Sequence, residues 1–528
     1  MTSSANTESL APAKDRTKVG FVSLGCPKNL VDSEVMMGML HHNGAQLTPD
    51  AQEADVIVIN TCSFIDSAKQ ESVNTILEMV QHKQQHGGKA SRIVVAGCLV
   101  ERYRDEIRKN IPEVDAVVGT GELDAILSAA GLAPAPATDS PFTILPESYA
   151  QPQIARAPSA VHQHSHPTEV GAQLAAEAAV FSRAEGDARE AAGRFSREAW
   201  DGATAALPSY LYSDETPRIL ATPRASAYIK IAEGCDHPCT FCIIPQLRGK
   251  FRSRRMSSIV AEAENLIAQG VREITLIGQD TTCYGEDLGL KDGLAELLAA
   301  LAVLPGLRWL RFLYTYPNKV TNRLLETMAK YDTIAKYLDV PLQHASPTVL
   351  KRMKRGGSGA IFLDLIARAR RIVPGIVIRT SFIVGFPGET EEDFAALCDF
   401  VKAAQIDWLG VFTYSDEEGA RAFELDPALK VPRRTIESRR RKLMKLQQRV
   451  STRAKAAWVG REIDLLVEGE SEETELLWQG RSPLHAPEID GKVLINDFGP
   501  HDALVPGTFY RAEITDSHDY DVVARILE

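Results

Sequence analysis

The sequence predicts an α/β protein with three folded parts: an amino-terminal open parallel α/β sheet, a partial (β/α)6 TIM-like barrel and a small carboxy-terminal β-barrel. Three patterns support this prediction. β-rich runs alternate with helical segments up to about residue 131, six more β/α units lie between about residues 223 and 446, and short strands separated by turns follow from residue 459. The domain boundaries are placed at 17–130, 218–457 and 458–528.

In the first part, four short runs have the composition of parallel strands: VGFVSL, ADVIVIN, RIVVAG and DAVVG. Helical segments separate them, which is the pattern of a parallel α/β sheet. A helix follows the first run. Asp32 and Ser33 are predicted to cap its start, and it is predicted to end near Gly44.

Residues 131–217 differ in composition from their surroundings. They contain 20 Ala and 9 Pro, no Lys and no Cys, and show no sustained hydrophobic period. Such a segment buries too little apolar surface to fold alone, so we expect a flexible insertion with one helix around Glu169–Ala192. His162, His164 and His166 within it could bind a metal, although a solvated polar tract fits the surrounding composition better.

The second α/β region contains six strand candidates separated by helical stretches: AYIKIA, EITLIG, WLRFLYT, YLDVPL, IVIRTSFIVG and WLGVFTY. Six β/α units of this spacing predict a partial barrel. The region ends in Arg433–Lys455, which carries ten Lys or Arg against one Glu. This segment is predicted to be a long basic helix.

The strongest chemical signal is the CxxxCxxC run of Cys235, Cys239 and Cys242. It follows the first barrel strand candidate, and the loops after the strands form the mouth of a β/α barrel. Three thiolates on one loop can ligate three irons of a cubane cluster and leave the fourth iron open. A zinc knuckle is the alternative, but it needs a fourth ligand, for which His237 is awkwardly placed.

Cys26, Cys62 and Cys98 form a second set, spaced 36 residues apart, and each follows a strand candidate of the first part. Because the carboxyl ends of parallel strands meet at one crevice, we expect these thiols to converge there. A second cluster with an open iron is favoured, and three buried structural thiols are the alternative. Cys283 is expected near the barrel mouth as a thiol without a ligand role, and Cys398 in the core.

Composition excludes several classes of protein. With 528 residues, 44% of them hydrophobic and 24% charged, the chain is not disordered, collagen-like or a coiled coil overall. The most apolar stretch, Leu294–Leu307, contains Glu296 and Pro305, so no membrane span is expected, and the first residues resemble no secretory signal. Eight cysteines in this context do not predict a disulfide scaffold. A cytoplasmic location is therefore expected.

The CxxxCxxC run after a first barrel strand resembles the radical S-adenosylmethionine (SAM) superfamily. The resemblance implies that the open iron of a 4Fe–4S cluster binds SAM, and that an injected electron splits SAM to give a 5'-deoxyadenosyl radical. It also implies that Phe241 flanks the adenine, that Gln279 and Asp280 face the methionine moiety, and that Gly385 borders the adenosine. For the last three residues, a plain strand-to-helix turn is the alternative.

Two cysteine triads in this order resemble the methylthiotransferase family, whose members combine an amino-terminal domain holding an auxiliary 4Fe–4S cluster, a radical SAM barrel and a TRAM β-barrel. The resemblance covers roughly residues 18–130 and 218–528. The segments that resemble the ribosomal-protein branch are VSLGCPKNLVDSE, INTCSFIDSAKQES, EGCDHPCTFCIIPQLRG, LDVPLQHAS and LWQGRSPLHAPEIDG. The tRNA branch typically has Cys-Gln-Met-Asn where this chain has Cys26-Pro-Lys-Asn29.

This resemblance implies two 4Fe–4S clusters and two uses of SAM. One SAM methylates a sulfur on the auxiliary cluster, and a second gives the radical that removes hydrogen from the β-carbon of an aspartate in small-subunit ribosomal protein uS12. That carbon then takes the methylthio group. An electron donor such as flavodoxin or ferredoxin is implied. Methylthiolation of a tRNA adenosine and a non-catalytic iron–sulfur RNA-binding protein remain the alternatives.

The charge of the last part bears on the choice of substrate. From residue 459 to the end there are 5 Lys or Arg and 16 Asp or Glu, a net charge of −11 that equals the net charge of the whole chain. A β-barrel that carried tRNA would be expected to show a basic stripe. An acidic barrel suits a basic partner such as a ribosomal protein, with solubility as the alternative explanation.

Overall fold

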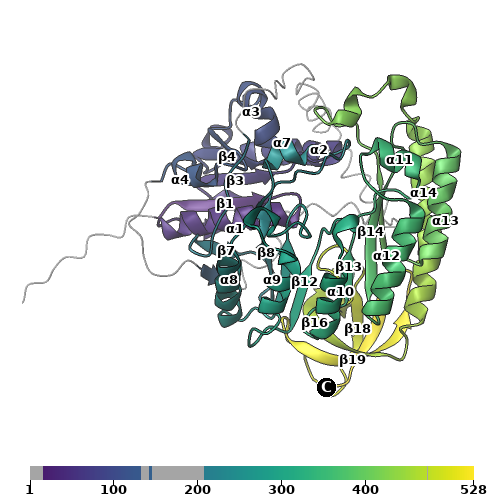
Figure 1. Ribbon diagram of the computed structural model, residues 1–528. Helices are drawn as coiled ribbons and strands as arrows, with labels where there is room; N and C mark the ends of the chain where they lie inside the picture. Colours follow the sequence, from purple (N-terminus) through teal and green to yellow (C-terminus); the bar gives the residue numbers. More distant parts are fainter. Residues whose placement is uncertain (1–15, 133–141, 145–206, 473) are drawn as a thin grey trace, which may run out of the picture.

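The computed structural model describes residues 16–132, 142–144 and 207–528, apart from residue 473 (Figure 1). Two predictions fall outside the described residues: the helix at Glu169–Ala192, and the three histidines between residues 162 and 166. The described chain forms three parts in the predicted order, with the amino-terminal part drawn in purple and blue and the carboxy-terminal barrel in yellow.

The amino-terminal part is a five-stranded sheet in the order β2-β1-β3-β4-β5, with all neighbours parallel. Four strands match the predicted runs, and the short edge strand β2 was missed because three residues carry too little pattern. The strands are β1 Lys18–Ser23, β2 Gln46–Thr48, β3 Val56–Thr61, β4 Arg92–Gly97 and β5 Ala116–Val118. The helices are α1 Pro27–His42, α2 Asp66–Val80, α3 Cys98–Asn110 and α4 Ile126–Ala129.

The start of α1 differs from the prediction. The helix begins at Pro27 with Cys26 as its N-cap, and Asp32 and Ser33 lie buried inside it, so the capping role predicted for them was wrong. Proline suits the first helical position because the N–H that it lacks would have no intrahelical partner there. The predicted end is confirmed, since the helix stops just before Gly44, whose φ is +88°.

The second part is the predicted partial barrel. It consists of two three-stranded parallel sheets, β8-β11-β12 and β13-β14-β15, joined by one bridge between Leu310 and Ile334. Each strand corresponds to one sequence candidate. The strands are β8 Ser226–Lys230, β11 Glu273–Ile277, β12 Trp309–Phe312, β13 Tyr337–Asp339, β14 Val377–Val384 and β15 Trp408–Thr413.

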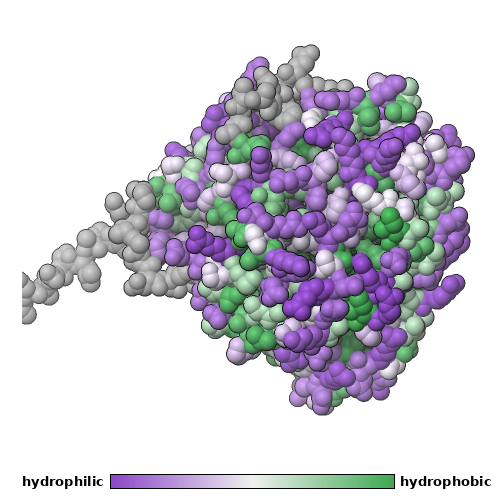
Figure 2. All heavy atoms as spheres, in the orientation of Figure 1, coloured by the Kyte–Doolittle hydropathy of each residue, from purple (hydrophilic) through white to green (hydrophobic). Residues whose placement is uncertain are grey.

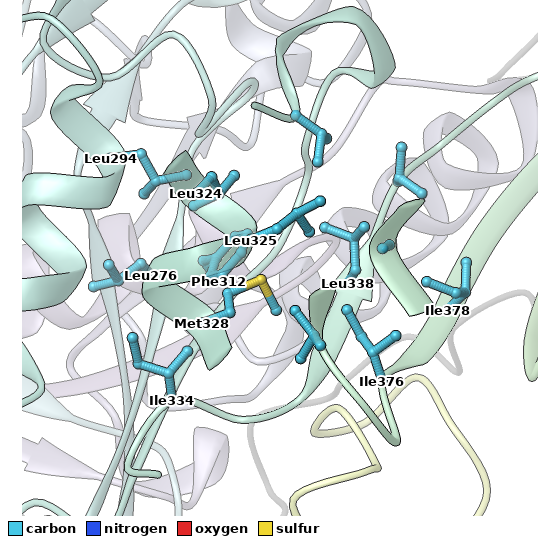
Figure 3. Packing of buried hydrophobic residues seen from close by; sticks show 14 of the residues in the cluster. Leu276, Leu294, Phe312, Leu324, Leu325, Met328, Ile334, Leu338, Ile376 and Ile378 are labelled. Atoms are coloured by element: carbon cyan, nitrogen blue, oxygen red, sulfur yellow. The ribbon is translucent and has the colours of Figure 1, made fainter. Parts of the chain in front are cut away.

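The helices of the barrel bury their apolar sides against the strands. Figure 3 shows Leu294 of α9 and Leu324 of α10 beside Phe312 of β12, and all three side chains are at most 3% exposed. The longer helices are α8 Met256–Ala268, α9 Gly293–Leu301, α10 Asn322–Lys330, α12 Gly359–Ile372 and α13 Glu391–Ala404; α7 Ile244–Arg248 and α11 Pro347–Arg352 are short. Cys398 on α13 is partly buried against this core, as expected.

The packed chain resumes earlier than the predicted boundary at residue 218. Tyr212 is only 2% exposed, and its hydroxyl lies 3.2 Å from a carboxylate oxygen of Glu262 on α8. A three-residue strand, β6 Phe142–Ile144, also pairs in parallel with β7 Arg218–Leu220. Elements this short carry no hydrophobic period, so they could not be separated from the insertion by composition.

The carboxy-terminal part is a closed barrel in the order β16-β17-β18-β20-β19, which confirms the predicted small β-barrel. Its strands are β16 Glu462–Ser471, β17 Thr474–Arg481, β18 Val493–Asp497, β19 Phe509–Ser517 and β20 Val522–Ile526. The predicted basic helix, α14 Arg433–Ala456, leads into it.

The small barrel packs against the amino ends of the large barrel's strands (Figure 1). Arg481 forms a 2.7 Å ion pair with Glu273, the first residue of β11. The hydroxyl of Tyr337, the first residue of β13, donates to Asp490 at 2.6 Å. The loops that follow the strands therefore lie at the opposite end of the large barrel.

Hydrophilic residues cover most of the face shown in Figure 2, with hydrophobic residues scattered among them. In the described part of the chain, no helix is both long enough and apolar enough to span a membrane.

Candidate active site

Cys235, Cys239 and Cys242 lie in the loop after β8 and the short strand β9 (Ala232–Glu233), at the mouth of the large barrel. The loop is held by the backbone N–H of Cys235, which donates to Gly249 O, and by that of Cys242, which donates to Cys239 O. A guanidinium nitrogen of Arg355 lies 3.5 Å from Cys239 Sγ. Positive charge therefore faces one thiol of this triad, which we call the barrel triad.

The electrostatics of the barrel triad suit a metal cluster. Burial and the neighbouring charges, including Cys239, raise the pKa of Cys235 to about 11 and that of Cys242 to about 12. Three thiolates at such close quarters repel one another, so a bound cation is what makes their joint ionisation favourable. The donor set of three thiols on one loop fits three irons of a cubane cluster.

A buried group of four charges lies beside the barrel triad. Lys230 at the end of β8 pairs with Glu233 at 2.5 Å and also bonds Asp32 of α1. Arg248 of α7 pairs with Asp32 at 2.6 Å and lies 3.4 Å from Glu233. Two cations and two anions balance, and the group joins the amino-terminal part to the large barrel.

Gln279, a predicted SAM contact, follows β11 and donates from Nε2 to Glu233 at 2.5 Å. The four-charge group therefore fixes the side chain of Gln279. Because Lys230 and Arg248 face Glu233, its pKa falls to about 2, although burial alone would raise it. The carboxylate stays ionised and keeps accepting the amide hydrogen bond.

Asp280 lies in a cluster that the sequence did not predict. His237 Nε2 lies 2.5 Å from Asp280 Oδ2, and Cys283 Sγ lies 3.1 Å from the same oxygen. The imidazole also stacks on Tyr316, with ring centroids 3.9 Å apart. Burial would raise the pKa of Asp280, but hydrogen bonds from His237, Thr282 and Cys283 lower it. Cys283 does lie at the barrel mouth, as predicted, and it contacts Asp280 there.

The two remaining predicted SAM contacts are Phe241, in the loop of the barrel triad, and Gly385. Phe241 is partly buried against the apolar cluster that contains Met353 and Phe386. Gly385 follows β14 with φ +79°, and a Cβ there would lie 2.4 Å from Ile436 of α14, so a side chain would not fit. The nitrogen of Gly385 also donates to Glu389, which fixes this turn.

The second triad forms at the carboxyl edge of the amino-terminal sheet, as predicted. Cys26 follows β1, Cys62 follows β3, and Cys98 follows β4 as the first residue of α3. A Cβ on Gly25, whose φ is +89°, would lie 3.0 Å from Cys62 Sγ, so the loop before Cys26 passes directly over that thiol. We call this set the sheet triad.

The three thiols of the sheet triad lie close enough to influence one another. Burial, together with the charges of Cys98 and Cys26, raises the pKa of Cys62 well above its ordinary value. Burial also raises the pKa of Cys98 to about 11, although Arg248 opposes this shift. The structure thus brings the three residues together, and the chemistry of the donor set fits a second cluster as well as it fits the first.

Arg248 links the sheet triad to the four-charge group and was missed by the sequence reasoning. One guanidinium nitrogen lies 3.4 Å from Cys98 Sγ, while another bonds Asp32 in the four-charge group. Its only sequence signal was its place six residues after Cys242 in the run PQLRG. The residues that it contacts lie 150 and 216 positions away.

A partial β/α barrel with a CxxxCxxC loop at its mouth defines the class of radical SAM enzymes, and the model of the Radical SAM superfamily matches residues 229–401. The Uncharacterized protein family UPF0004 matches residues 18–119, and the TRAM domain matches residues 459–527. These matches cover the three parts that the structure shows.

Near full-length relatives define the family. The protein named Ribosomal protein uS12 methylthiotransferase RimO from Koribacter versatilis is 63% identical, and the match covers 98% of this chain and 97% of the relative. Proteins of the same name from Solibacter usitatus (53% identical, 97% and 95% covered) and Geobacter sulfurreducens (42%, 97% and 99%) also match. The chain belongs to the RimO family of radical SAM methylthiotransferases, which confirms the resemblance to the ribosomal-protein branch.

Proposed function

We propose that this protein transfers a methylthio group to the β-carbon of an aspartate in ribosomal protein uS12. The observation that carries the proposal is the presence of two cysteine triads, one at the carboxyl edge of the amino-terminal sheet and one at the barrel mouth, in a chain of the RimO family. Buried contacts of Arg248 connect the sheet triad to the four-charge group, whose Glu233 lies two residues before Cys235.

Each triad has a role in this proposal. Cys235, Cys239 and Cys242 would hold a 4Fe–4S cluster that binds SAM; Cys26, Cys62 and Cys98 would hold an auxiliary 4Fe–4S cluster. When bound, these groups supply a radical able to remove hydrogen from an unactivated carbon, and a sulfur that can be methylated and transferred. The chain itself supplies ligation, orientation and charge around them.

The other residues orient the bound molecules. Arg355 places positive charge beside Cys239, and Glu233 accepts a hydrogen bond from the amide of Gln279. We propose that Phe241, Gln279, Asp280 and Gly385 contact SAM. The rigid turn at Gly385, where a Cβ would meet Ile436, supports its part in this site. A flavodoxin or ferredoxin is the proposed electron donor.

The test is mass spectrometry of uS12 and of tRNA from cells that lack this chain, complemented either with the intact protein or with the Cys239→Ala variant. The target aspartate should carry the methylthio mass only with the intact protein. If uS12 stays unmodified and a tRNA adenosine gains the group, the tRNA alternative is correct. If neither uS12 nor tRNA carries the methylthio group in any strain, both proposed substrates are contradicted.

A further inference from the structure

Lys28 lies between the sheet triad and the barrel mouth. It is the second residue of α1, two positions after Cys26, and only 9% of its surface is exposed. Its ammonium nitrogen lies 3.2 Å from the centroid of the Tyr314 ring and 3.5 Å from Gly278 O. Gly278 follows β11 and Tyr314 lies just after β12, so both contacts belong to loops of the mouth.

The ammonium of Lys28 has no acidic partner among the residues that the structure describes. Its contacts there are a ring face and one long hydrogen bond to a carbonyl. The nearby carboxylates serve other cations, because Asp32 bonds Lys230 and Arg248, and Asp339 pairs with Arg379 at 2.7 Å. A buried ammonium without a carboxylate partner can pair with a carboxylate that a ligand brings.

The ring beneath Lys28 is held in a strained backbone. Tyr314 has φ +64°, which is rare for a bulky side chain. Three hydrogen bonds hold this turn: the Tyr314 N–H donates to Asp339 at 2.8 Å, and Thr281 donates to Tyr314 O and, through its hydroxyl, to Leu313 O. Strain maintained by its surroundings is characteristic of functional sites. Here it aims an aromatic face at the ammonium, a favourable cation–π arrangement.

From these observations we propose that Lys28 is a specificity-determining residue that binds the carboxylate of the substrate aspartate. The inference rests on the proposed function. The acceptor carbon must reach both triads, and its carboxylate is one bond away from it. Lys28 presents from the sheet triad toward the mouth a positive charge that no carboxylate of the described residues pairs with, so an aspartate would be preferred over an uncharged asparagine of the same shape.

The carboxylate of SAM is the competing anion. It would bind with the methionine moiety at the barrel triad, on the loop that contains Cys235, Cys239 and Cys242. Lys28 belongs to the other triad, but it also contacts Gly278, the residue before Gln279. Deoxyadenosine release is therefore measured beside uS12 binding, so that the two anions can be told apart.

The test compares the reconstituted wild type with Lys28→Met, which keeps the length of the side chain and removes the charge. The probes are recombinant uS12 and the same protein with asparagine at the target position, with binding measured by anaerobic calorimetry. Lys83→Met is the matched control, because Lys83 is an equally buried lysine of the same domain that pairs with Asp115 at 2.8 Å. Iron content, deoxyadenosine release and methylthio product are measured for every variant.

The wild type and the Lys83→Met control should bind the aspartate form about 10-fold to 100-fold more tightly than the asparagine form, as expected for a hydrogen bond between charged groups. Lys28→Met should bind both forms equally, with iron content and SAM cleavage unchanged. If Lys28→Met does not fold, Lys28→Gln carries the same test.

Two results would overturn the inference while leaving the proposed function intact: undiminished preference for aspartate in Lys28→Met, or loss of SAM binding in that variant. If the wild type modifies neither form of uS12, the proposed function fails, and the inference fails with it.

Discussion

Replacing Asp32 with Asn should strongly destabilise the docking of the two parts that carry the triads. Asp32 is an anion shared by Lys230 and Arg248, and all three side chains are at most 4% exposed. With Glu233, they form a group of two positive and two negative charges. The substitution keeps the shape of the side chain and leaves one buried positive charge uncompensated.

The magnitude follows from this burial. Removing one partner of a buried ion pair costs about 3–5 kcal/mol, because the remaining charge has lost both solvent and its partner. Burial by itself would lower the pKa of Lys230, and it is Asp32 and Glu233 that raise it. In the variant, the pKa of Lys230 should fall, so part of the cost is relieved by proton loss at higher pH.

The assay is urea denaturation of the apo-protein, followed by circular dichroism. Asp399→Asn is the matched control, because Asp399 pairs with Lys402 on the surface of α13, with side-chain exposures of 74% and 60%. Exposed pairs contribute about 0–1 kcal/mol. Adding Lys230→Met to Asp32→Asn restores neutrality, so the double variant should lose less stability than the sum of the two single variants. A cost for Asp32→Asn no larger than that of the control would refute this reasoning.

Three further predictions concern the clusters, a buried lysine and the acidic barrel. Cys239→Ala should abolish deoxyadenosine release while iron stays on the sheet triad, and Cys62→Ala should release deoxyadenosine without methylthio product; loss of all iron in either variant would contradict two separate sites. Burial lowers the pKa of Lys455 from 10.5 to about 8. Unfolding therefore takes up a proton between these values, and the free energy of unfolding should rise from pH 8 to 10.5. The rise should be smaller in Lys455→Met. If urea denaturation gives the wild type and this variant the same dependence of unfolding free energy on pH, the low pKa of Lys455 is contradicted. Charge reversal of the exposed Glu462 and Glu472 should slow modification of uS12 but leave SAM cleavage unchanged. The difference in modification rate between wild type and variant should shrink as salt is added, because ions screen exposed charges beyond about 8 Å at physiological ionic strength. Faster turnover on tRNA would favour the alternative substrate.

The sequence was sufficient for every element with a clear hydrophobic pattern. The six strands of the large barrel and the five of the small one coincide with β-rich runs. Strands buried on both faces give continuous apolar runs, and strands buried on one face give alternation, so both leave a pattern in the sequence. The misses among the described strands are β2, β6, β7, β9 and β10 (Arg252–Ser253), each of two or three residues. The start of α1 was misplaced because Asp32 and Ser33 look like caps locally, whereas buried partners elsewhere in the fold use both side chains.

Convergence of the cysteines could be predicted for the same reason, since the topology of a parallel sheet brings strand ends together. The charges around them could not be predicted. Arg248 and Asp32 are 216 residues apart, Lys230 and Asp32 are 198 apart, and Lys28 and Gly278 are 250 apart. These contacts depend on how the amino-terminal sheet docks on the large barrel, and docking leaves no local period in the sequence.

The placement of the acidic barrel limits what it can do for the reaction. It packs on the amino ends of the strands, against Glu273 and Tyr337, whereas the triads lie near the carboxyl ends. A strand as long as β14, with eight residues, separates the two ends by roughly 25 Å. The acidic surface is therefore too far away to touch the reacting aspartate. If it attracts a basic substrate, it acts on encounter and orientation, so charge reversal there should raise KM and leave kcat nearly unchanged, whereas Lys28 acts where the carboxylate binds.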